Sequence, residues 1–320
     1  MKPEKITIGS RGSALALWQA NWIKSQLETL HKGLQVEIRI IKTSGDKIQN
    51  VPLTKIGGKG LFVKEIEEAL MRKEVDLAVH SMKDVPMKLP IELCIAVITE
   101  RENPFDALIS RDGTPLADLP PNAKIGTGSL RRSSQLLQYR PDLEIVSLRG
   151  NIDTRIKKLD SEGLDGVILA SAGLRRMGWQ EKITEIISPD ILLPAMGQGA
   201  IGIETRKHDP DVQGLIVDLD DEKTHLALDA ERAFVGILEG GCQVPIGAFA
   251  TLDDENDELT VRGLVASLDG KTVYKWDKQG PRHDAQKLGR ELGKDLLKMG
   301  ADRILEEIYR QSDATPPSNP

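Results

Sequence analysis

The spacing of apolar and polar residues along the chain predicts an alternation of strands and helices. Residues 36–40 alternate apolar and charged side chains, which is typical of a half-buried strand. Residues 15–27 repeat apolar side chains at helical spacing and follow Ser13, a residue that can cap a helix. The apolar face of that helix is expected to comprise Leu15, Trp18, Trp22 and Leu27.

The same patterns predict two α/β units. In the first, strands are expected at residues 5–9, 36–40, 76–80 and 93–99. In the second, which begins near Asn103-Pro104, strands are expected at residues 106–110, 123–126, 144–148 and 166–170, and helices at 129–139, 151–161 and after Ser171. A strand at residues 200–204 is expected to return to the first sheet. This order predicts parallel or mixed sheets, with loops from the carboxyl ends of strands lining a cleft.

The pattern changes after a helix at residues 222–238. Strands at 246–252, 258–267 and 272–276 then precede a long helix at 284–309. We therefore expect an α/β fold of three domains. They are domain 1 (residues 1–100 with 200–220), domain 2 (101–199) and a small α+β domain 3 (221–312). The Ser/Pro-rich tail, residues 313–320, is expected to be disordered.

Composition narrows the class of protein. The 320 residues carry a net charge of −6 and only 3% aromatics, which argues against a nucleic-acid binder. The start of the chain lacks the apolar run of a signal peptide, and no segment has the length of a membrane span. Two cysteines favour a reducing cytoplasm over a disulfide framework, and the cysteines and histidines lack metal-ligand spacing.

One of those cysteines lies where packing does not require it. Cys242 follows Gly240-Gly241 after a helix and precedes Val244-Pro245. Two glycines allow a large group to approach the main chain, so the sulfur could carry an attached group in a cleft. The alternative is an inert, buried cysteine, which is how free cysteine usually behaves. Cys94, within an apolar strand, fits that second description.

Basic residues gather at predicted strand-to-helix turns. Residues 124–176 contain ten Lys/Arg against six Asp/Glu, a local +4. Helix N-termini and guanidinium groups both bind anions, and no Walker loop is present, so we expect a ligand with many carboxylates. The turns carry Arg11, Ser13, Arg131, Arg132, Arg149, Arg155, Arg175 and Arg176.

Asp84 is the one carboxylate expected among these basic loops. It could shuttle protons or stabilise a developing cation, or it could simply cap its loop. His80 ends an apolar strand, and a structural role suits it better than that of a base. A hydrolase built from Cys242, His80 and Asp84 lacks a nucleophile elbow in the sequence.

Together these residues resemble the hydroxymethylbilane synthase (porphobilinogen deaminase) family. The likeness runs from about residue 5 to residue 310, and its diagnostic stretches are residues 57–63, 79–86, 126–132, 148–151, 194–200 and 239–247. The resemblance implies two lobes similar to periplasmic binding proteins flanking a cleft, plus the small C-terminal domain. It also implies a monomer without metal, nucleic acid or membrane.

The resemblance further implies a transferase of tetrapyrrole (haem and chlorophyll) biosynthesis. In that family a dipyrromethane cofactor is attached to a cysteine by a thioether, which maps onto Cys242. Porphobilinogen loses ammonia to give an electrophile that the terminal pyrrole attacks, and after four additions water releases the linear tetrapyrrole hydroxymethylbilane. Each ring carries an acetate and a propionate, which accounts for the arginines.

By the same resemblance, each predicted residue has a role. Asp84 would be catalytic. Cofactor carboxylates would be bound by Ser13, Ser81, Lys83, Thr127, Ser129, Arg131, Arg132 and Gln198. Substrate and growing chain would be handled by Arg11, Gln19, Arg149, Arg155 and Arg176, and a mobile loop would contain Lys55, Lys59 and Phe62. Gly128 departs from the family, where serine is frequent, so one hydroxyl contact to the cofactor is expected to be missing.

Two other functions fit part of the pattern. A non-catalytic, two-lobed polyanion-binding protein would explain the arginines but not a third domain carrying Cys242. A thiol-dependent transferase without a permanent adduct would use Cys242 but would leave the protein unmodified.

Overall fold

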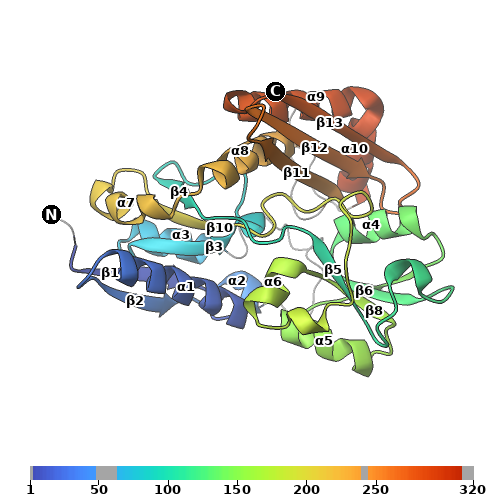
Figure 1. Cartoon of the computed structure of the whole chain (residues 1–320), viewed down its shortest axis with the longest axis horizontal. Helices are drawn as coiled ribbons and strands as arrows, with labels where there is room; N and C mark the ends of the chain where they lie inside the picture. Colours follow the sequence, from blue (N-terminus) through green and yellow to red (C-terminus); the bar gives the residue numbers. More distant parts are fainter. Residues whose placement is uncertain (1–2, 48–62, 239–243, 312–320) are drawn as a thin grey trace. The chain divides into compact units, whose positions relative to one another are not determined.

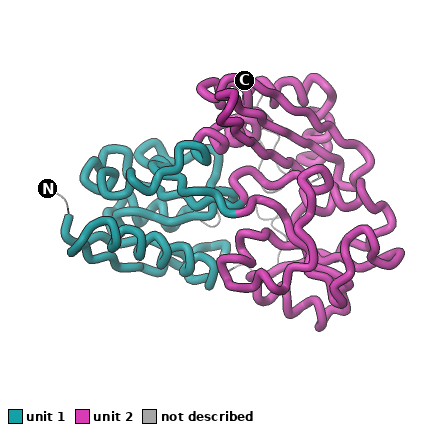
Figure 2. Tube along the Cα trace, viewed as in Figure 1, with its two compact units in different colours: residues 1–50, 59–102, 199–225 teal, residues 51–58, 103–198, 226–320 magenta. Residues whose placement is uncertain are grey.

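The computed structural model describes residues 3–47, 63–238 and 244–311. The chain divides into two compact units (Figure 2). Unit 1 comprises residues 1–50, 59–102 and 199–225, and unit 2 comprises residues 51–58, 103–198 and 226–320. The chain therefore leaves unit 1 beside Asn103-Pro104 and returns to it at Gly199.

Unit 1 is a five-stranded mixed sheet with the strand order β2-β1-β3-β10-β4 (Figure 1). Its strands are β1 (Lys5–Ser10), β2 (Gln35–Ile40), β3 (Leu77–Ser81), β4 (Leu93–Ile98) and β10 (Ile201–Arg206). Its α-helices are α1 (Ala14–Leu30), α2 (Ser44–Lys47), α3 (Lys64–Met71) and α7 (Pro210–Ile216). β10 runs antiparallel between β3 and β4, which confirms that the chain returns a strand to the first sheet.

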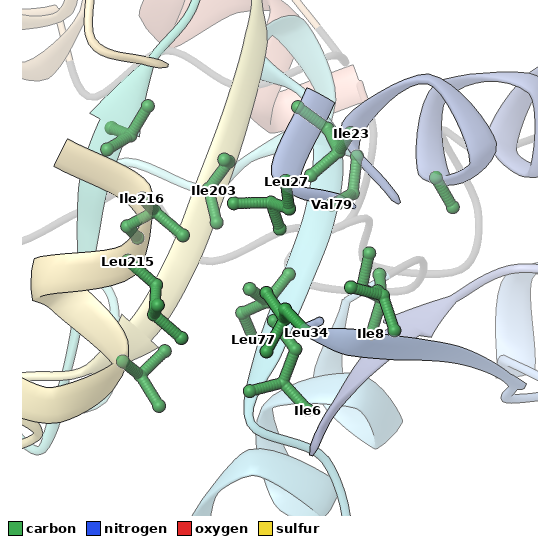
Figure 3. Close-up of a cluster of buried hydrophobic side chains, with 14 of the residues drawn as sticks. Ile6, Ile8, Ile23, Leu27, Leu34, Leu77, Val79, Ile203, Leu215 and Ile216 are labelled. Carbon is green, nitrogen blue, oxygen red and sulfur yellow. The ribbon is translucent and has the colours of Figure 1, made fainter. Parts of the chain in front are cut away.

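The core of unit 1 forms where α1 and α7 pack against the sheet (Figure 3). Ile6 and Ile8 of β1 meet Ile23 and Leu27 of α1, and all are at most 1% exposed. The expected apolar face of α1 was partly wrong. The buried residues are Gln19, Ala20, Ile23 and Leu27, whereas Trp18 is 37% exposed. The buried face includes the polar Gln19 and leaves out Trp18, so it is rotated around the helix relative to the expected face.

Unit 2 contains a second five-stranded sheet, with the order β7-β6-β8-β5-β9. Its strands are β5 (Asp106–Ser110), β6 (Lys124–Thr127), β7 (Glu144–Ser147), β8 (Gly166–Ala170) and β9 (Glu185–Ile186). The helices α4 (Leu130–Tyr139), α5 (Ile152–Ser161) and α6 (Ser171–Arg176) follow β6, β7 and β8 in turn. Apart from the short β9, these elements match the sequence-based expectation within a few residues.

The third sheet, also in unit 2, is antiparallel and three-stranded, in the order β11-β12-β13. It comprises β11 (Ile246–Asp253), β12 (Glu258–Ala266) and β13 (Val273–Pro281), and α8 (Glu222–Ile237) precedes it. α9 (Ala285–Leu296) packs on β12 and β13. The single long helix expected at 284–309 was wrong: Gly300 has φ 113°, outside the helical region, and separates α9 from α10 (Asp302–Gln311).

The mixed α/β class is confirmed, with two sheet-rich parts and a small α+β part at the C-terminal end. The three-domain boundaries stay a prediction, and the tail at 313–320 lies outside the described residues. In the part of the chain that is described, no helix combines the length and apolar character needed to cross a membrane.

Candidate functional site

Three parallel strands of unit 2 end at one edge of their sheet. β6 pairs in parallel with both β7 and β8, so the turns that follow these strands lie together. These turns carry most of the basic residues singled out from the sequence. The structure thus gathers, within one unit, the residues Thr127, Ser129, Arg131, Arg132, Arg149, Arg155 and Arg176.

The turn between β6 and α4 is organised by two hydroxyl groups. Ser129 caps α4, with its Oγ accepting from the backbone N–H of Arg132 at 3.4 Å. Thr127, 3% exposed, accepts from the backbone N–H of Ser129 at 3.2 Å. A side chain at Gly128 would meet the carbonyl oxygen of Leu148, so the turn fits closely against the end of the neighbouring strand. Glycine is therefore required here by the main chain as it stands.

Arg131 and Arg132 turn inward from α4 and meet Asp106 of β5. Arg131 Nη1 lies 2.7 Å from Asp106 Oδ2, and Arg132 donates from Nε (3.0 Å) and Nη2 (2.7 Å) to Oδ1. Backbone carbonyls hold the same guanidiniums, Leu193 at 2.8 Å from Arg131 and Ile168 at 3.0 Å from Arg132. Burial alone would raise the pKa of Asp106, but the two guanidiniums outweigh it and hold that pKa well below its usual range.

Gln198 joins the same cluster. It is 1% exposed, and its Nε2 donates to Asp106 Oδ1 at 2.9 Å and to the Pro104 carbonyl at 2.8 Å. The structure therefore brings three predicted cofactor-binding residues onto one buried carboxylate. Whether they also bind a ligand carboxylate stays a prediction.

Arg149 and Arg155 flank the turn between β7 and α5. Arg155 donates from Nε to the Gly150 carbonyl at 2.8 Å, so its side chain folds back toward that turn. Gly150 has φ 114°, and a side chain there would meet Thr154, so glycine is needed for this close return. Arg149 is half-buried, as is Arg176 at the end of α6.

Unit 1 has an equivalent edge. β1 pairs in parallel with β2 and β3, so the turns after β1 and β3 lie together. Ser13 caps α1, accepting from the N–H of Ala16 at 3.4 Å, as expected. Gln19, 2% exposed, donates from Nε2 to Ser81 Oγ at 2.9 Å and so ties the helix after β1 to the end of β3. Arg11 lies in the same turn as Ser13.

Lys83 and Asp84 follow directly, in a short 3-10 turn (Met82–Asp84). Met82 is fully buried, and its N–H donates to the Ala200 carbonyl at 3.0 Å. This hydrogen bond anchors the turn to the residue directly before β10. Asp84 is exposed and Lys83 half-buried. The anchored turn therefore presents an exposed carboxylate at Asp84, next to Lys83 in the sequence.

His80 is buried and has a buried carboxylate as its partner. Its Nε2 lies 2.9 Å from Glu204 Oε2, and both side chains are buried. The structural role expected for His80 is confirmed.

Four predicted residues lie outside the described part of the chain: Cys242, Lys55, Lys59 and Phe62. Cys94 is half-buried in β4, where its sulfur lies 3.9 Å from Thr205 Oγ1. Among the described residues, no group of His, Cys, Asp and Glu is placed to hold a metal ion.

Asp106 and Glu231 are two of the buried acids that the sequence analysis missed. Asp106 was assigned only to a strand. Glu231 of α8, fully buried, accepts from the N–H of Gly197 (2.7 Å) and of Ala250 (2.9 Å). Asp106 stands in an otherwise apolar strand, and an acid in such a stretch is a usable signal, because buried carboxylates need partners. Glu231 lies between the charged residues Asp229 and Arg232 and offers no such signal.

At the sheet edge within each unit, guanidinium, hydroxyl or lysine groups are gathered in the turns, and such donors suit carboxylates. These features define an α/β protein with basic strand-to-helix turns. The sequence comparisons are more specific. The family model "Porphobilinogen deaminase, dipyromethane cofactor binding domain" matches residues 6–214, and "Porphobilinogen deaminase, C-terminal domain" matches residues 225–298.

Curated relatives agree over nearly the full chain. Porphobilinogen deaminase of Syntrophobacter fumaroxidans is 53% identical, covering 97% of this chain and 100% of that one. Porphobilinogen deaminase of Geotalea uraniireducens is also 53% identical, covering 97% of each chain. The chain belongs to the porphobilinogen deaminase family. Likeness to solved structures is weaker: the periplasmic VFT2 domain of Bordetella pertussis BvgS gives a TM-score of 0.39 at 16% identity, over 67% of this chain and 85% of that one.

Proposed function

We propose that this chain deaminates porphobilinogen and joins four molecules of it head to tail, releasing hydroxymethylbilane and ammonia. The primer would be a dipyrromethane held by a thioether to Cys242. When bound, the dipyrromethane supplies the nucleophilic pyrrole carbon from which the product grows. Family membership over nearly the whole chain is the observation that carries this proposal.

The primer's carboxylates would be held by hydroxyl, amide and cationic side chains. The proposed residues are Ser13, Ser81, Lys83, Thr127, Ser129, Arg131, Arg132 and Gln198. The hydroxyls cap helix N-termini or end strands, and Arg131 and Arg132 are fixed by hydrogen bonds to backbone carbonyls and to Asp106, which supports a preorganised anion site.

Incoming porphobilinogen would be bound by Arg11, Gln19, Arg149, Arg155 and Arg176. Arg11 and Arg149 lie in turns that follow strands, whereas Gln19, Arg155 and Arg176 lie in the helices that follow such turns. Each charged hydrogen bond to an acetate or propionate contributes about 1.5–3 kcal/mol. Lys55, Lys59 and Phe62 would belong to a loop that covers the site.

Asp84 would carry the proton chemistry. Departure of ammonia from porphobilinogen leaves positive charge on the substrate, which a nearby carboxylate stabilises. The same carboxylate would accept the proton lost when the new carbon–carbon bond restores the pyrrole. Its exposure on a rigid turn supports this role, because the group has to reach successive substrates.

We further propose that the protein acts as a cytoplasmic monomer. The two cysteines are consistent with a reducing compartment. Sedimentation of the purified protein at several concentrations tests the oligomeric state, and a mass of twice the chain would contradict it.

The mass of the intact purified protein tests the primer. We expect wild type to exceed its sequence mass by two linked pyrrole units, and Cys242→Ser to have the unmodified mass. Cys94→Ser is the matched control and should keep the adduct, since Cys94 lies within β4. An unmodified wild type, or an adduct retained by Cys242→Ser, would contradict the proposal.

A further inference from the structure

Asp106 is the point at which the predicted primer-binding residues of unit 2 meet. This fully buried carboxylate accepts from Arg131, Arg132 and Gln198 at 2.7–3.0 Å. Both arginines are 5% exposed. Without Asp106, two buried guanidiniums next to each other in sequence would repel each other and would each keep only a backbone carbonyl as a partner.

The cluster has more positive than negative charge. One carboxylate faces two guanidiniums, and among the described residues no other acid forms an ion pair with either arginine. Both arginines also lie in the first turn of α4, where the helix dipole disfavours cations. Burial lowers the pKa of Arg131, with Asp106 opposing that change, so burial of this charge is costly. One further negative charge would complete the cluster.

The orientation of Arg131 leaves it able to accept that charge. Its bonds to Asp106 and Leu193 both leave from Nη1. Within the described residues, Nε and Nη2 of this side chain have no hydrogen-bond partner, and these two atoms form one edge of the guanidinium fork. That edge matches a carboxylate in bidentate fashion.

A second buried carboxylate, Glu231, holds the backbone next to Gln198. Glu231 binds the backbone N–H of Gly197, and the next residue, Gln198, donates to Asp106. The residue before Gln198 is therefore held at its backbone by one acid, and the side chain of Gln198 is held by another. These hydrogen bonds fix Gln198, the member of the cluster that comes from the segment before β10 and not from α4.

We propose that Asp106 is a positioning residue of the primer site. It holds Arg131 and Arg132 in fixed orientations and leaves the cluster one negative charge short, which a ligand carboxylate supplies. The proposal rests on the proposed function and adds a residue that acts through the arginines and not on the substrate.

The test measures loading of the primer, which is independent of turnover. Unloaded protein is incubated with porphobilinogen, and the fraction carrying the adduct is followed by intact mass at a temperature where every variant is folded. Asp106→Asn should load about tenfold more slowly or worse, because charge-assisted hydrogen bonds that fix the arginines are lost. Asp106→Glu keeps the charge but displaces the guanidiniums. Its rate of loading should therefore lie between those of wild type and Asp106→Asn.

Two controls separate positioning from other effects. Asp190→Asn removes an exposed ion pair with Arg262 in the same unit and should load as wild type does. Alkylation of Cys242 by neutral iodoacetamide should proceed equally in all variants, which shows that the thiol is intact and reachable.

The outcomes are distinct. Loading of Asp106→Asn at the wild-type rate would show a merely structural carboxylate, and faster loading would show one that only competes with the ligand; either overturns the proposal. Should Asp106→Asn not fold, Asp106→Glu decides, and wild-type loading by it would overturn the proposal. A wild type that never acquires the adduct would instead contradict the proposed function.

Discussion

His80 Nε2 and Glu204 Oε2 lie 2.9 Å apart across the neighbouring strands β3 and β10, and the two side chains are 5% and 1% exposed. His80 lies in β3, directly before the turn that presents Asp84. Glu67 of α3 is also buried, and within the described residues neither its Oε1 nor Oε1 of Glu204 has a hydrogen-bond partner. Unit 1 therefore holds two acids and one histidine in its interior.

This cluster makes the stability of the protein depend on pH. Burial, and then the charge of Glu204, raise the pKa of Glu67 from 4.5 to about 7, with His80 opposing them. A raised pKa in the folded state means that folding favours the protonated acid. The resulting stabilisation is complete below pH 4.5 and is lost as the pH rises through about 7.

Glu67→Gln, a permanently neutral side chain of the same size, should flatten that dependence. Thermal unfolding measured between about pH 5 and 8 should show the wild-type midpoint falling with pH more steeply than that of the variant. Glu68→Gln is the matched control, because Glu68 lies half-buried on the same helix, next to the buried Glu67. Parallel curves for wild type and Glu67→Gln would contradict the assignment.

Asp84→Asn should fold normally and lose on the order of 10²–10⁴-fold in turnover, the usual contribution of acid–base catalysis. Normal folding is expected because Asp84 is exposed and its turn is anchored by the buried Met82. Asp118→Asn, which changes an exposed aspartate at the end of another 3-10 turn, should keep wild-type activity. A fully active Asp84→Asn would remove the carboxylate from the mechanism.

Arg149→Ala should stall elongation at partial adducts. Loss of one charge-assisted hydrogen bond weakens capture of the substrate by about 1.5–3 kcal/mol, or roughly 10- to 150-fold. Intact mass after a brief exposure to porphobilinogen should show intermediate species that wild type passes through. Arg290→Ala, on the exposed side of α9, serves as control. A single species with wild-type turnover would rule out this role.

Gly128→Ser tests the departure from the family pattern. The new Cβ would meet the Leu148 carbonyl oxygen, so we expect destabilisation of about 1–3 kcal/mol despite the added hydroxyl. Chemical denaturation measures the change. Gly214→Ala in α7 has open space around it and should be neutral or slightly stabilising. A Gly128→Ser variant more stable than wild type would contradict this prediction, because it would mean that the main chain at Leu148 moves away at little cost.

The order of strands and helices was predictable because apolar periodicity is a local property. The edges at which Arg131, Arg149 and Arg155 gather were also predictable, since parallel strands place their following turns together. The partner of the arginines was not. Asp106 lies 25 positions from Arg131 and 92 from Gln198, and their meeting depends on how α4 and the segment before β10 pack on β5.

Two local errors had different causes. The break at Gly300 had a visible signal, a glycine within a long helical pattern, but periodicity on both sides concealed it. The rotated face of α1 had no signal in the sequence, because burial of Gln19 depends on its hydrogen bond to Ser81, 62 positions away.

The most direct measurement of the central claim is the mass of the protein during single additions of porphobilinogen. The account predicts a ladder of covalent species on wild type, each heavier than the last by one pyrrole unit, and no ladder on Cys242→Ser. Formation of hydroxymethylbilane by a protein whose mass never changes would contradict it.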